Sequence, residues 1–219
     1  MPFIDSLKRY PSAGLLAVQL LGLLLYPLME TFPSGRTLFQ AFGLVVLGAA
    51  LFAVRRSPWL TWIGLLLAIP VIVLSIISAI APRPDLVVWT AALEALFYFY
   101  ATGSLIAYML QDADATTDEL IAAGATFTLL AWAFAYVFVV CQALLPGSFV
   151  LSGGRAAETW MELLFLSVSV LSSVGLSDIV PSTPMARAII ALESFVGVLY
   201  IALVVSRLIA LSTHKKVQG

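Results

Sequence analysis

The chain has 219 residues, of which 62% are hydrophobic and only 11% are charged, with a formal net charge of −1. That composition excludes an ordinary soluble globular domain, and the charge gives no reason to expect nucleic-acid binding. One cysteine (Cys141) and one histidine (His214) cannot build an internal disulfide or a tetrahedral metal site. No serine lies in a nucleophile-elbow pattern with a histidine and an acid available, so we expect no enzyme.

The first half of the chain is a series of apolar runs near the ~20 residues that cross a bilayer as helix. Turn residues or basic pairs separate these runs, as at Pro33, Gly35, Arg55-Arg56 and Pro82. We expect four transmembrane helices here, at about residues 13–29, 37–54, 59–80 and 86–110.

The second half contains two long apolar runs with a shorter one between them. The fifth crossing follows the polar segment 111–119 and ends near residue 145, and the sixth covers about 184–211. The run at 160–171 is too short to span a bilayer, so we expect a re-entrant helix. A polar stretch, Ser-Ser-Val-Gly-Leu-Ser-Asp at 172–178, follows directly.

Aligned by eye, that stretch resembles the selectivity filter Thr-Val-Gly-Tyr-Gly-Asp, with Ser173, Val174, Gly175 and Asp178 in register. The following segment 181–200 is similar to the outer mouth and inner helix of bacterial channels. It places Gly197 where that family commonly has a hinge glycine. The chain thus resembles the bacterial six-transmembrane potassium-channel-like family (ion channel pore domain), with a degenerate selectivity filter, over about residues 118–211.

The resemblance implies an all-α membrane protein with six transmembrane helices plus a re-entrant pore helix and filter loop. Residues 1–111 would form a four-helix sensor-like transmembrane domain. Residues 112–219 would form the pore domain, with outer helix, pore helix, filter and inner helix. Because one strand cannot surround an ion, we expect a homotetramer. Residues 86–110 contain no basic residue, so this voltage-gated-like architecture lacks sensor charges and should be voltage-insensitive.

The implied ion-binding filter is Ser173, Val174, Gly175, Leu176 and Ser177, with permeant potassium at the first three of these and no other cofactor. Asp178 would lie at the outer mouth and Gly197 would act as the gating hinge. Leu176 replaces the family's tyrosine, so an aromatic cuff cannot brace the outer filter, and we expect altered outer ion sites. Ser177 replaces the second glycine, where left-handed dihedrals would cost about 1–2 kcal/mol.

Three further polar residues of the pore domain are candidates for function. We expect Glu193, an acid inside the sixth crossing, to line the vestibule, to brace the filter from behind or to pair with Arg187. Glu162 suits the N-terminus of the pore helix electrostatically.

Two other acidic features have open interpretations. For Glu94, in the fourth crossing, we favour a position near the outer interface over a polar partner in the bundle. The acidic residues of segment 111–119 either cap the fifth helix and are solvated, or form a fourfold ring at the cytoplasmic mouth. Those residues are Asp112, Asp114, Asp118 and Glu119.

Basic residues set the expected topology. If the chain crosses the membrane six times, seven basic residues fall on the side of both termini and four fall on the other side. The seven are Lys8, Arg9, Arg55, Arg56, Arg207, Lys215 and Lys216, and the four are Arg36, Arg83, Arg155 and Arg187. This favours a multi-pass protein of a bacterial-type inner (plasma) membrane with cytoplasmic N- and C-termini.

The function predicted from these features is passive conduction of monovalent cations, with potassium preferred. The alternatives are a weakly selective or non-selective cation channel, and a non-conducting membrane scaffold or receptor that keeps the fold.

Overall fold

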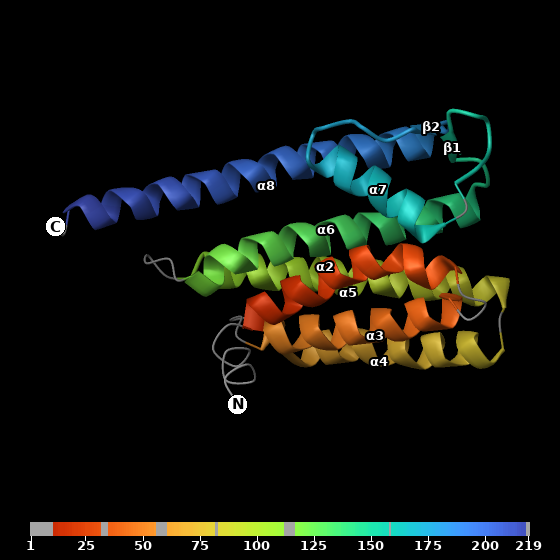
Figure 1. The fold of residues 1–219 in the computed structure, drawn as a ribbon, viewed down its shortest axis with the longest axis horizontal. Coiled ribbons are helices and arrows are strands. Elements are labelled where there is room, and N and C mark those ends of the chain that lie inside the picture. The colour runs from red at the N-terminus through yellow and green to blue at the C-terminus, as the bar shows by residue number, and fades with distance from the viewer. Residues whose placement is uncertain are drawn as a thin grey trace.

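The structure is a computed structural model, which describes residues 11–31, 35–55, 61–81, 83–111, 117–157 and 159–217. The chain is mostly helical, as predicted, and Figure 1 shows the helices lying roughly along one direction. They are α2 (Pro11–Thr31), α3 (Gly35–Val54), α4 (Thr61–Ile80), α5 (Pro84–Met109), α6 (Thr117–Leu144), α7 (Trp160–Leu171) and α8 (Pro184–Val217). Two short strands, β1 (Phe149–Leu151) and β2 (Ile179–Pro181), pair antiparallel and were not predicted.

Three of the described helices are long and apolar enough to cross a membrane: Asp85–Met109, Asp118–Leu144 and Pro184–Val204. These are the fourth, fifth and sixth predicted crossings, so the structure supports a membrane protein. The apolar parts of α2, α3 and α4 are shorter, at Ser12–Leu28, Ala41–Val54 and Trp62–Ser78. The total of six crossings therefore stays a prediction.

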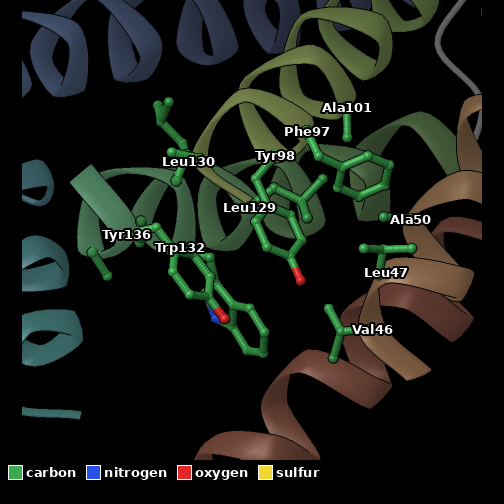
Figure 2. Close-up of a cluster of buried hydrophobic side chains, with 14 of the residues drawn as sticks. Val46, Leu47, Ala50, Phe97, Tyr98, Ala101, Leu129, Leu130, Trp132 and Tyr136 are labelled. Carbon is green, nitrogen blue, oxygen red and sulfur yellow. The ribbon is translucent and has the colours of Figure 1, made fainter. Parts of the chain in front are cut away.

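Helix α6 lies at the centre of the subunit. Helices α2 and α5 pack against it on one side, and α7 and α8 on the other (Figure 1). Because α6 is apolar all round, it buries side chains in every direction, including Leu129, Trp132 and Phe138. Figure 2 shows part of this core, where residues of α3 such as Val46 approach Tyr98 of α5 and the α6 side chains.

Candidate functional site: the loop between α7 and α8

A capping box fixes the start of the short helix α7. The Glu162 backbone N–H donates to the Thr159 hydroxyl at 3.2 Å, and the Thr159 N–H donates to the Glu162 carboxylate at 3.0 Å. Arg155 pairs with the same carboxylate at 2.5 Å. The Glu162 carboxylate thus lies where the sequence placed it, at the positive end of the helix dipole.

An aromatic cluster attaches the first residue of α7 to the helix bundle. The ring of Trp160 lies 4.9 Å from that of Trp132 and 5.7 Å from that of Tyr136, both on α6. It also approaches Tyr26 of α2 at 6.3 Å.

The side chain of Glu94 is hydrogen-bonded to Tyr136. Glu94 thus has a polar partner inside the bundle, the alternative that we did not favour, and its position near the outer interface stays a prediction.

Beyond α7, the backbone N–H groups of the loop turn back towards the helix. The amides of Val174 and Gly175 both donate to the Ser169 carbonyl, each at 3.1 Å. The amide of Ser177 donates to the Ser169 hydroxyl at 3.1 Å. One buried residue in the last turns of α7 therefore holds three peptide units of the loop.

The carbonyl groups of the same peptide units point the other way. A trans peptide places its N–H and C=O on opposite sides, so the carbonyls of Ser173, Val174 and Leu176 are directed away from α7. In the part of the chain that the structure describes, no hydrogen bond reaches a carbonyl oxygen of residues 173–177. The loop therefore presents a row of oxygens on its outer side, where the Leu176 side chain is 74% exposed in the single subunit.

Two loop residues have left-handed backbone dihedrals. Gly175 has φ +67°, which glycine adopts without a steric penalty. Ser173 has φ +60° and is the only non-glycine residue with positive φ in the described part of the chain. Our expectation of left-handed strain at Ser177 is therefore wrong, because the bond to Ser169 holds that peptide in another conformation and the strain falls on Ser173.

The outer end of the loop is attached to the β1–β2 pair. The carbonyl of Asp178 accepts hydrogen bonds from the Ser152 backbone N–H at 3.0 Å and from its hydroxyl at 2.9 Å, while the Asp178 residue stays exposed. The Arg187 guanidinium donates to the Pro181 carbonyl at 3.3 Å. Arg187 thus supports the outer loop, and no bond between Arg187 and Glu193 is formed.

Glu193 is fully buried and contacts α7, the helix that precedes the loop. One of its carboxyl oxygens contacts the Ser167 hydroxyl, which also lies 2.9 Å from the Ala131 carbonyl. These contacts join α8, α7 and α6. Of our three interpretations of Glu193, the structure supports bracing from behind.

At Gly197, α8 packs closely against the end of α7. A β-carbon at this position would lie 2.3 Å from the Leu171 carbonyl oxygen, so only glycine fits. Helix α8 continues without interruption through Gly197. The close contact gives the glycine a packing role, and the hinge role stays a prediction.

The acidic residues at the start of α6 have partners within the subunit. The Asp118 carboxylate accepts from the Ser12 N–H at 3.3 Å, the Ser12 hydroxyl at 3.1 Å and the Tyr108 hydroxyl at 3.3 Å. Glu119 pairs with Arg207 of α8 at 3.3 Å, and both acids are buried. Asp118 and Glu119 therefore join helices and are not solvated as we expected, and the fourfold ring stays a prediction. Asp112 and Asp114 lie outside the described residues.

Sequence reasoning missed Ser169, although the two serines at 167 and 169 in an otherwise apolar helix were a visible signal. The five residues predicted as the filter lie on the short loop after α7, and their role stays a prediction: Ser173, Val174, Gly175, Leu176 and Ser177.

A comparison with protein families bears on the same region. A family model described as "Ion channel" matches residues 123–213, which cover most of α6, the loop and most of α8. No curated protein and no solved structure matches the chain. The class that the fold, the loop and this match support is an ion channel. This part of the chain is similar to the ion channel family over nearly the region that the sequence motifs indicated.

Proposed function

We propose that the protein is a monovalent cation channel that conducts passively through a tetrameric pore and prefers potassium. The observation that carries the proposal is the orientation of the loop peptides. The amides of Val174, Gly175 and Ser177 bond to Ser169, so the opposite carbonyl oxygens are available to replace the water of a cation. The C-terminal end of α7, the negative end of its dipole, adjoins these oxygens and favours a cation.

A homotetramer follows from the same geometry, since one loop contacts an ion from one side only. An apolar face of α8 is available for neighbouring subunits. Leu192, Phe195 and Leu199 repeat at helical spacing and are all exposed in the single subunit, Phe195 by 64%. The exposed Asp178 would lie at the outer mouth of the assembled pore, where its carboxylate raises the local cation concentration.

Weak selectivity among monovalent cations is the second candidate, and one observation favours it. The side chain of Leu176 is apolar and exposed, and the loop has no aromatic hydroxyl that would brace its outer half. The inner oxygens at Ser173 and Val174 are held by Ser169, so we assign the main potassium sites to them. The membrane is of the bacterial inner (plasma) type, with both termini in the cytoplasm, as the basic residues indicate.

The test is potassium flux from liposomes that contain verified tetramers under a potassium gradient. We expect flux from the native protein and none from Gly175→Ala, because a β-carbon opposes the left-handed dihedral that turns the carbonyl. Gly153→Ala is the matched control, since nothing lies within 4 Å of its added β-carbon. Native tetramers without flux would overturn the channel in favour of a non-conducting scaffold, and a conducting Gly175→Ala variant would overturn the filter assignment.

A further inference from the structure

The hydrogen bonds of Ser167 require more protons than its own hydroxyl group can donate. The Ser167 oxygen lies within hydrogen-bond distance of two oxygens, the Ala131 carbonyl at 2.9 Å and the Glu193 carboxyl. A serine hydroxyl has one proton to donate and two lone pairs to accept with. The Ala131 carbonyl accepts only, so it takes the serine proton. The second contact is then satisfied only if Glu193 donates.

The surroundings of Glu193 agree with a neutral side chain. The residue has no exposed surface, and among the described residues its second carboxyl oxygen has no hydrogen-bond partner. Both ion pairs recorded in the described part of the chain, Arg155 with Glu162 and Arg207 with Glu119, involve other acids. A buried carboxylate with no cation and one unsatisfied oxygen is strongly disfavoured, whereas a neutral acid leaves only a carbonyl-type oxygen unpaired.

We propose that Glu193 is a protonated carboxylic acid and serves as a hydrogen-bond donor. Its O–H donates to the Ser167 oxygen, and the Ser167 O–H donates to the Ala131 carbonyl. This two-bond relay joins the inner helix α8 to the outer helix α6 through Ser167 of α7. Ser167 lies two residues before Ser169, which holds the loop. Glu193 is therefore a positioning residue for the loop and adds no negative charge near the ion path.

One consequence rests on the proposed function. If Glu193 were ionised beside the pore, its charge would attract cations, and removing the charge would lower conductance. A neutral donor predicts the opposite outcome for Glu193→Gln, since the amide N–H₂ donates to Ser167 as the acid does. We expect this variant to keep native conductance and ion preference, whereas Glu193→Ala loses the relay.

The first test does not depend on flux. Infrared difference spectra between the native tetramer and Glu193→Gln should show the C=O band of a protonated carboxylic acid that the variant lacks. Glu94→Gln is the control for the partly buried acid of α5, whose side chain is hydrogen-bonded to Tyr136. A carboxylate band in the difference spectrum would overturn the proposal, and that is the result expected if a neighbouring subunit supplies a cation.

The second test compares melting temperatures of the tetramers. Glu193→Ala should melt roughly 5–10 °C lower, while Glu193→Gln stays near the native value. Equal losses in both variants would overturn the donor role. If the native protein shows the acid band and this stability pattern but no flux, the proposed function fails and the neutral acid stands.

Discussion

Helices α6 and α8 are both long and apolar, yet they are buried to different extents within one chain. Of the membrane-spanning part of α6, 56% is buried within the subunit, against 17% for α8. Helix α6 is surrounded by α2, α5, α7 and α8, whereas α8 rests on α6 and α7 along one side only (Figure 1). The difference shows that α6 is covered within the chain, whereas much of α8 and the loop before it stay exposed; in the proposed tetramer, neighbouring subunits would cover these surfaces.

The largest effect is expected from truncating a side chain on the exposed face of α8. Phe195→Ala should dissociate the proposed tetramer, in which the interface would bury this side chain, because truncating a buried phenylalanine costs about 3–5 kcal/mol for each of the four copies. Light scattering after size-exclusion chromatography in detergent measures the assembly. Ile69→Ala is the control, since Ile69 is comparably exposed but belongs to α4, which lies on the side of the bundle away from α8 (Figure 1). An intact Phe195→Ala tetramer would mean that this face of α8 meets lipid instead.

A second prediction concerns the point where α8 touches α7. Gly197→Ala places a β-carbon 2.3 Å from the Leu171 carbonyl oxygen, and backbone cannot move aside cheaply. We expect a loss of about 1–3 kcal/mol, the usual range for overpacking. In Gly48→Ala nothing lies within 4 Å of the added β-carbon, so this control should gain about 0.5–1 kcal/mol from helix propensity. Thermal unfolding measures the stability of both variants. A Gly197→Ala protein as stable as the native one would contradict the packing role and favour the hinge role of this glycine.

The ion pair between Glu119 and Arg207 attaches the C-terminal part of α8 to α6. Any movement of this end of α8 away from α6 must break the pair, which is mostly buried. We expect Arg207→Gln to weaken the contact between α8 and α6 by about 1–2 kcal/mol after allowing for partial exposure. If movement of this end of α8 opens the proposed channel, the open fraction should rise about 5–30-fold. Single-channel recording measures the open fraction. Arg155→Gln breaks the more exposed pair with Glu162 and should leave the open fraction unchanged. Equal effects of the two variants on the open fraction would count against a role for α8 movement.

The sequence predicted the helices well because each follows from a local apolar run. The short helix predicted at 160–171 is observed at Trp160–Leu171, and its re-entrant position stays a prediction. Contacts between distant segments could not be predicted in this way. Ser12 and Asp118 are 106 residues apart, and nothing local indicates that they meet. The loop residues were identified from a motif, but which of them is left-handed depends on the bonds to Ser169, which only the folded arrangement shows.

The outer half of the loop offers a smaller change. Replacing Leu176 and Ser177 by Tyr and Gly restores the residues that the potassium-channel-like family has there. We expect potassium preference over sodium to rise about tenfold, equivalent to ~1.4 kcal/mol, because more regular outer sites favour the larger ion. The reversal potential under mixed potassium and sodium gradients measures the change. An unaltered reversal potential would show that the inner oxygens alone set the preference.

The smallest effect concerns the left-handed serine. Ser173→Gly should stabilise the subunit by about 1 kcal/mol, because glycine adopts φ +60° without the penalty that a β-carbon brings. For a chain of this length that corresponds to a rise in melting temperature of about 2–4 °C. Ser177→Gly is the matched control and should give no gain, since Ser177 is not among the residues with positive φ and its hydroxyl also accepts from the Ile179 amide at 3.2 Å. A gain at Ser177 in place of Ser173 would mean that the strain lies where the motif placed it, and that Ser169 does not hold the loop in this conformation.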